Sequence, residues 1–123
     1  MSNMENDHSK YFSFETCKTK FEVKELIKKI DAVEYPENAD IIDFLFECLQ
    51  DINWPFFEEA VECIKNDYPT EFALEAVERK LAEAEEDKDY MWIGGLYYLL
   101  KAMDIRTDRL SEQARSILEH RDF

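Results

Sequence analysis

Apolar residues recur every three or four positions along most of this 123-residue chain, a spacing typical of amphipathic helices. Polar breaks divide the pattern into six segments. We predict helices over residues 20–32, 39–50, 54–66, 71–86, 90–103 and 108–120. The segments 39–50 and 90–103 carry apolar residues on more than one face, so these two helices are expected to be central.

Residues suited to N-capping stand where five of these helices would begin. An N-cap side chain accepts a hydrogen bond from a free backbone N–H in the first turn of the helix. Pro55 falls in the first turn of the third helix, where a missing N–H costs little. The predicted N-caps are Asn38, Asn53, Thr70, Asp89 and Thr107.

Helices of this length, joined by short links, are expected to pack as successive antiparallel hairpins. We therefore predict an all-α fold of about six helices that form a short α-solenoid. The sequence has no clean internal repeat, so a compact irregular helical bundle is the alternative. Residues 1–15 are predicted to be a flexible N-terminal arm, with a short extended segment at 11–15, and residues 16–123 to be a single α-helical domain.

The chain has 29 acidic and 15 basic residues and a formal net charge of −14. Nucleic acid and anionic membrane surfaces repel such a chain, so basic proteins are the expected partners. The first ten residues lack the apolar stretch of a signal peptide, and the longest apolar run, residues 90–100, is too short to cross a bilayer. Cys17, Cys48 and Cys63 are interpreted as buried thiols in a reducing cytoplasm, without disulfides. We expect a cytoplasmic protein that is a monomer when free.

The charge is concentrated in residues 31–78, which hold fourteen acids and a single base, Lys65. Many of these acids are three or four positions apart, so they share helix faces, although each such pair costs about 0.2–0.5 kcal/mol. In a stack of hairpins, the acidic stripes of the second and fourth helices would merge into one surface. The predicted partner-binding residues are Asp40, Asp43, Glu47, Asp51, Trp54, Glu58, Glu59, Glu62, Glu71, Glu75 and Glu78. The alternative interpretation is an acidic face that only keeps the protein soluble.

Three aromatic residues and a glycine pair admit both a structural and a functional interpretation. Trp54, Tyr97 and Tyr98 are either interface anchors or core residues, because tryptophan and tyrosine are common in both settings. Gly94 and Gly95 lie inside an apolar helix, where each costs about 1 kcal/mol relative to alanine. Close approach of another helix explains them better than contact with a ligand.

No arrangement of residues indicates catalysis or a cofactor. The two histidines, His8 and His120, lie near the chain ends, and the spacings of zinc sites, phosphate-binding loops and serine hydrolases are missing. Cys48 and Cys63 lie on apolar stripes without a suitably placed base. Carboxylates at 58, 59 and 62, or in residues 83–89, could hold a cation, but helix-borne carboxylates make poor cages without turn carbonyls. We expect no metal and no cofactor.

The segment FLFECLQDINWPFFEEAVECI, residues 44–64, resembles a family of small bacterial all-helical domains without an assigned activity. The likeness centres on the corner from Leu49 to Pro55, includes the later segment DYMWIGGLYYLL, and covers about residues 17–120. This chain departs from the family pattern in its extra acids around the corner and in Gly94–Gly95. The resemblance implies a HEAT-like helical repeat. It also implies an association with polymorphic or contact-dependent toxin systems, in which small acidic proteins act as immunity partners.

The acidic helices and the resemblance agree on one hypothesis. We expect a non-enzymatic immunity protein, or antitoxin, that covers the active site of a basic secreted toxin domain such as a nuclease. A helical-repeat adaptor for another basic protein or peptide is the alternative, and an enzyme with a concealed carboxylate acid–base pair is the third. Capture of a basic partner should weaken steeply as salt rises, whereas an enzyme should depend on only one or two of the acids.

Overall fold

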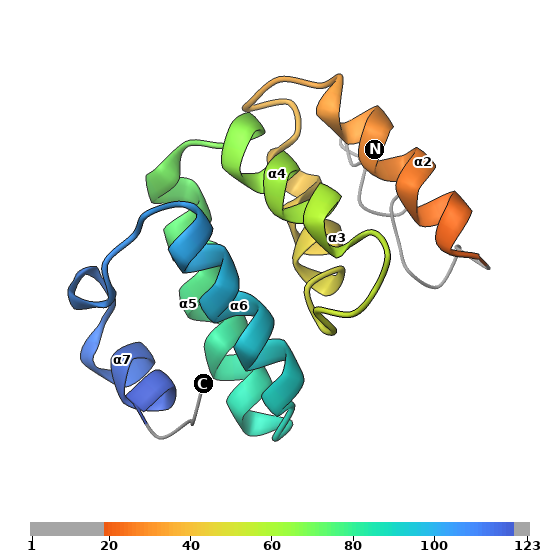
Figure 1. Ribbon diagram of the computed structural model, residues 1–123. Coiled ribbons are helices and arrows are strands. Elements are labelled where there is room, and N and C mark those ends of the chain that lie inside the picture. Colours follow the sequence, from red (N-terminus) through yellow and green to blue (C-terminus); the bar gives the residue numbers. More distant parts are fainter. Residues whose placement is uncertain (1–18, 120–123) are drawn as a thin grey trace, which may run out of the picture.

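All regular secondary structure in residues 19–119, which this computed structural model describes, is helical (Figure 1). The all-α class is therefore confirmed for this part of the chain. The predicted arm, Cys17, His8 and His120 lie outside the described residues. The elements are α2 (Lys20–Asp31), the 3₁₀ turn η2 (Ala39–Ile41), α3 (Ile42–Glu47), α4 (Phe57–Asp67), α5 (Thr70–Glu86), α6 (Tyr90–Ala102), the 3₁₀ turn η3 (Thr107–Arg109) and α7 (Glu112–Glu119).

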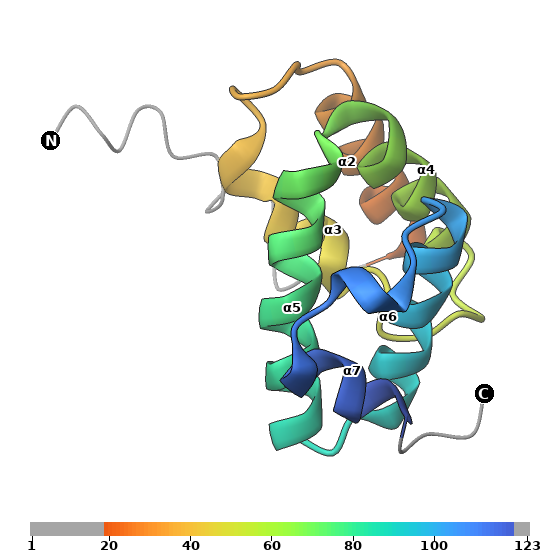
Figure 2. The same ribbon diagram turned by 90° about the vertical axis from the view of Figure 1, so that its left-hand side faces the viewer.

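Each helix packs mainly on helices one or two places away in the chain. The chief contacts are α2 with α4, α4 with α3 and α6, and α5 with α3, α6 and α7. Figures 1 and 2 show α5 and α6 side by side, with α7 against α5. Stacked hairpins make contacts of this kind, and so do irregular bundles. The short solenoid therefore stays a prediction.

The predicted second helix, residues 39–50, is wrong as a single element. The chain forms the turn η2, then the six-residue helix α3, and leaves the helical path after Glu47. The backbone N–H groups of Cys48 and Leu49 turn back to bond carbonyls within α3. The indole Nε1 of the buried Trp92, in α6, donates to the carbonyl of Phe46 at 2.9 Å. A distant side chain thus adds a further hydrogen bond to a carbonyl at the end of α3, where intrahelical donors run out.

Of the five predicted N-caps, Asp89 is confirmed with its capping hydrogen bond. The Asp89 carboxylate accepts a hydrogen bond from the backbone N–H of Trp92 at 3.2 Å. Asn38 stands at the N-cap position of η2 as predicted, but its side chain makes no capping hydrogen bond. The other three predictions are wrong. Thr70 is already the first residue of α5, Phe56 and not Asn53 precedes α4, and Thr107 lies inside η3. Pro55 accordingly lies before α4 and outside its first turn.

Asn38 instead ties the η2 turn to the end of α4. Its side-chain Nδ2 donates to the backbone carbonyls of Val33 and Asp67, both at 3.1 Å. The hydroxyl of Tyr68, the residue after α4, donates to the carbonyl of Asn38 at 2.8 Å. These reciprocal bonds fix the end of α4, and therefore fix Asp67, relative to α2.

Gly95 allows α6 to cross the connection between α3 and α4 at close range. A Cβ added at this position would overlap the carbonyl oxygen of Leu49 and would lie 3.1 Å from its carbonyl carbon. The structural explanation of this glycine is therefore confirmed, although its neighbour is the turn after α3 and not another helix.

Cys48 and Cys63 are buried free thiols, as expected. In residues 19–119, no helix combines the length and apolar character needed to span a membrane.

Candidate functional site: an acidic groove between α2 and α4

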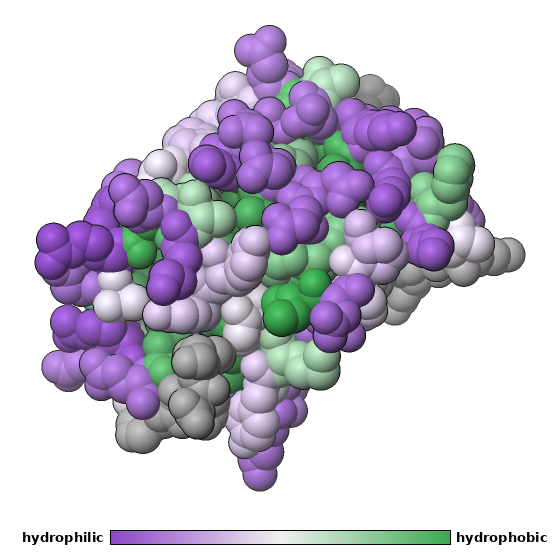
Figure 3. All heavy atoms as spheres, in the orientation of Figure 1, coloured by the Kyte–Doolittle hydropathy of each residue, from purple (hydrophilic) through white to green (hydrophobic). Residues whose placement is uncertain are grey.

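A groove of about 310 Å³ lies between α2 and α4. The buried side chains of Ile27 and Cys63 provide an apolar floor. Exposed carboxylates surround it, together with Asn66 and a single basic residue, Lys28. Figure 3 shows hydrophilic side chains over α2 and α4, with apolar surface between them. The lining carboxylates are Asp31, Glu58, Glu59 and Glu62.

The groove exists because two amphipathic helices lie side by side in the same direction. Near the start of the pair, Lys24 of α2 forms an ion pair with Glu59 of α4 at 3.3 Å, and near its end Asp31 approaches Cys63. The buried face of α4 points into the core, which leaves its glutamates along the open side. Both helix C-termini consequently lie at one end of the groove, where the helix dipoles add negative potential.

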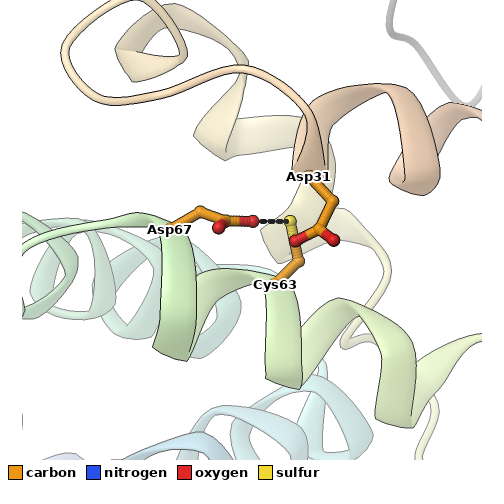
Figure 4. A group of neighbouring side chains, drawn as sticks. All are labelled: Asp31, Cys63 and Asp67. Carbon is orange, nitrogen blue, oxygen red and sulfur yellow. Dashed lines mark hydrogen bonds between the residues drawn. The ribbon is translucent and has the colours of Figure 1, made fainter.

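Three side chains converge at that end, as Figure 4 shows. Asp31 is the last residue of α2, Asp67 is the last of α4, and Cys63 lies one turn before Asp67. The thiol of Cys63 donates to Oδ2 of Asp67 at 3.2 Å. One ligand-type atom from each side chain lies within 4.8 Å of the other two. No salt bridge joins Asp31 or Asp67 to a basic side chain in residues 19–119.

Desolvation and the neighbouring carboxyl group change how this cluster titrates. Burial, followed by the hydrogen bond with Asp31, raises the pKa of Asp67 to about 6. Burial and the adjacent Asp67 raise the pKa of the Cys63 thiol far above its ordinary range. Because nucleophilic attack and metal ligation both need the thiolate, Cys63 is suited to donating a hydrogen bond and poorly suited to either of those roles.

The raised pKa of Asp67 predicts a pH dependence of stability. The folded state holds this proton more tightly than the unfolded state, so the stabilisation is complete below pH 4 and is lost as the pH rises through about 6. Asp67→Asn keeps a neutral donor beside Asp31 and should remove this loss. We expect the variant to be more stable than the wild type at pH 7.5 by about 1 kcal/mol, a value reduced because Asp67 is partly exposed.

Urea denaturation of both proteins at pH 4.5 and 7.5 measures the difference. Glu86 is an exposed carboxylate at the end of α5. The variant Glu86→Gln serves as the control and should change stability equally at both pH values. An Asp67→Asn protein that is less stable than the wild type at pH 7.5 would show that the charged form of Asp67 is the favoured one.

The groove also borders an exposed aromatic side chain. The hydroxyl of Tyr98, in α6, donates to Oε2 of Glu58 at 2.7 Å, and this bond raises the pKa of the tyrosine. The Tyr98 ring packs edge-on against Phe57, and 41% of the residue remains exposed. Trp54, the predicted anchor, is half-buried and tilted against Phe56 at a centroid distance of 5.3 Å. Tyr98 is thus the aromatic residue that joins the acidic groove to the open surface.

Other predicted acids have partners from outside residues 31–78, either a base or a backbone N–H. Asp43 lies 3.6 Å from Arg79 and 3.7 Å from Lys80 of α5, and Glu71 forms an ion pair with Arg109. The carboxylate of Glu78 accepts a hydrogen bond from the backbone N–H of Ser111 at 2.9 Å. The expectation that the stripes of the second and fourth helices merge into one uncompensated surface is therefore wrong at these positions.

The remaining predicted residues lie outside the groove. Asp51 accepts a hydrogen bond from the backbone N–H of Asn53 at 2.8 Å, so it shapes the corner. Asp40 lies in η2, Glu47 ends α3, and Glu75 is exposed on α5. Among the predicted residues, the structure brings Glu58, Glu59 and Glu62 together at the groove.

The sequence-based prediction missed Asp31, Asp67 and Lys28, and it left Tyr98 undecided. One local signal was present for the two aspartates. Each stands at the end of a predicted helix, where the dipole favours cations over anions. An acid in that position is a reason to look for an unusual environment. No local signal links Tyr98 to Glu58, because they are forty residues apart.

Fold and site together define the class of protein: a small acidic helical domain with a carboxylate-lined groove between two parallel helices. The chain belongs to the family described as a domain of unknown function (DUF5071), whose model matches residues 16–120. No match was found among curated proteins or among solved structures. The family match agrees with the resemblance to domains that lack an assigned activity.

Proposed function

We propose that the protein is an immunity protein that binds a cognate basic toxin domain, such as a secreted nuclease, and blocks its active site. One observation carries the proposal. The groove carboxylates of Asp31, Glu58 and Glu62 form no salt bridge with any basic side chain in residues 19–119. A surface of this kind attracts lysine and arginine side chains and raises the rate of encounter with a basic protein.

Exposed apolar side chains elsewhere on the surface also suit a protein partner. Large apolar side chains stay exposed on the α3–α4 connection and on α6, and they supply the desolvated contact that tight interfaces need. These side chains are Ile52, Met91 and Tyr98. Since Tyr98 bonds Glu58, aromatic contact and charge meet at the edge of the groove. A partner with basic residues around an apolar centre matches this arrangement.

Inhibition under this proposal is steric and electrostatic and needs no cofactor. A nuclease binds the phosphates of its substrate with lysine and arginine side chains. Carboxylates of the immunity protein occupy these same side chains and exclude the substrate from the cleft. The protein would act in the cytoplasm of the cell that produces the toxin.

Co-expression with the product of the neighbouring upstream gene tests the proposal. We expect that product to arrest growth alone, and we expect growth to recover when both proteins are made. The two proteins should also elute as a complex from gel filtration. A neighbour that binds without being toxic would favour the helical-repeat adaptor, and a neighbour that neither binds nor inhibits growth would refute the immunity proposal.

A further inference from the structure

We propose that the groove between α2 and α4 takes up one arginine side chain of the basic partner, whose guanidinium bonds the carboxylates of both helices. The inference rests on the proposed function and names the chemistry by which the groove would recognise its partner. It follows from the apolar floor, from the charges around it, and from the arrangement of those charges on two helices.

The floor of the groove suits the aliphatic part of an arginine. Ile27 and Cys63 present apolar surface at the bottom of a volume of about 310 Å³. Long basic side chains bury their methylene groups on such surface while the charged head stays near polar groups. The thiol of Cys63 stays protonated and bonds Asp67, so it adds no charge to the floor.

The groove has more negative than positive charge, so it favours a cation. Four carboxylates line it, and of the two bases nearby one pairs with a lining carboxylate and the other pairs with a carboxylate outside the lining. Lys24 pairs with Glu59, and Lys28 pairs with Glu25 of its own helix at 3.6 Å. The C-termini of α2 and α4 add partial negative charge at the end where Asp31 and Asp67 lie.

The distribution of carboxylates favours a guanidinium over an ammonium or a metal ion. Asp31 comes from α2, whereas Glu58 and Glu62 come from successive turns of α4. The planar guanidinium has five donors in a fixed fork, so it bridges separate carboxylates, and it gives up its water more readily than an ammonium does. A hard metal ion needs several convergent oxygens, and Asp31, Glu58 and Glu62 do not form a convergent group of this kind.

Two-dimensional NMR titration of the full chain with a capped hexa-arginine peptide tests the inference. Capped hexalysine and an uncharged Gly-Ser hexapeptide serve as comparison probes. We expect hexa-arginine to shift the backbone amides of Ile27, Asp31, Glu62 and Cys63, and to bind at least fivefold more tightly than hexalysine. Equal affinities for the two basic peptides, or shifts confined to α5 and α7, would overturn the proposal.

Paired variants separate the groove from the total charge. Asp31→Asn with Glu62→Gln should weaken hexa-arginine binding at least tenfold. Glu86→Gln with Asp87→Asn removes as much charge from the far end of α5 and should change affinity less than twofold. All four side chains are exposed, and thermal melting checks that both variants fold. Equal losses in the two variants would show that net charge alone attracts the peptide.

The titration and the co-expression test fail independently. A toxin complex that leaves the amides of α2 and α4 unshifted would refute the arginine groove and leave the immunity function standing. Hexa-arginine bound in the groove, together with the lack of a toxic neighbour, would support the arginine groove and refute the immunity function.

Discussion

Gly95→Ala is expected to lower the free energy of unfolding by about 3 kcal/mol or more, or to prevent folding. The added Cβ would overlap the carbonyl oxygen of Leu49, and it would also lie 3.3 Å from Cε1 of Phe57. Overpacked cores usually lose about 1–3 kcal/mol. The obstacle here is backbone in a buried turn, which has less freedom to move than a side chain. We therefore expect a loss at the upper end of that range or beyond it.

Urea denaturation of Gly95→Ala beside Gly94→Ala measures this effect. Gly94 is the preceding residue of the same helix and is partly exposed. Alanine favours helix by about 1 kcal/mol over glycine, so Gly94→Ala should leave stability unchanged or raise it slightly. Equal stability of the two variants would mean that α6 does not approach the Leu49 carbonyl as closely as the structure shows.

The double variant Glu58→Lys/Glu62→Lys is expected to raise the dissociation constant of the partner complex by about 100-fold or more. It places two cations at the edge of the groove that should receive a cation, and it also removes the acceptor of the Tyr98 hydroxyl. Loss of a buried charged contact costs about 2–5 kcal/mol, and about 1.4 kcal/mol corresponds to tenfold in affinity. Surface plasmon resonance with the proposed toxin partner measures both affinity and association rate.

A matched control keeps the change of net charge and moves it away from the groove. Glu86→Lys with Asp87→Lys alters the same total charge at the far end of α5. We expect less than a threefold change in the dissociation constant for this control. If the two double variants weaken binding equally, the partner senses only the overall charge of −14 and not the groove.

The helices could be predicted from the sequence because their periodicity is local. Val23, Ile27 and Ile30 repeat at helical spacing, and all three are buried on α2 as this pattern requires. Helix ends were harder to predict where distant groups decide them. Asn38 looks like an N-cap in sequence, but it bonds the carbonyl of Asp67, which is 29 residues away. The end of α3 depends in the same way on Trp92, which lies three helices further along the chain.

The charge pattern predicted part of the candidate site and misled elsewhere. A count along the chain showed fourteen acids against one base in residues 31–78. In space, Arg79, Lys80 and Arg109 return from later segments and pair with Asp43 and Glu71. Among the groove glutamates, Glu59 pairs with Lys24 of α2. Glu58 and Glu62 form no salt bridge within residues 19–119 and so escape this neutralisation. Which acids stay unpaired is a property of the packing, and one-dimensional spacing does not contain it.

Hydrogen exchange of the isolated protein and of its complex with the proposed basic partner tests the central claim most directly. If basic side chains of the partner enter the α2–α4 groove, backbone amides from Ile27 to Asp31 and from Glu58 to Cys63 should become protected in the complex. Residues 82–88, at the far end of α5, should exchange as they do in the free protein. Protection confined to α5 and α7, with the groove amides unchanged, would contradict the account.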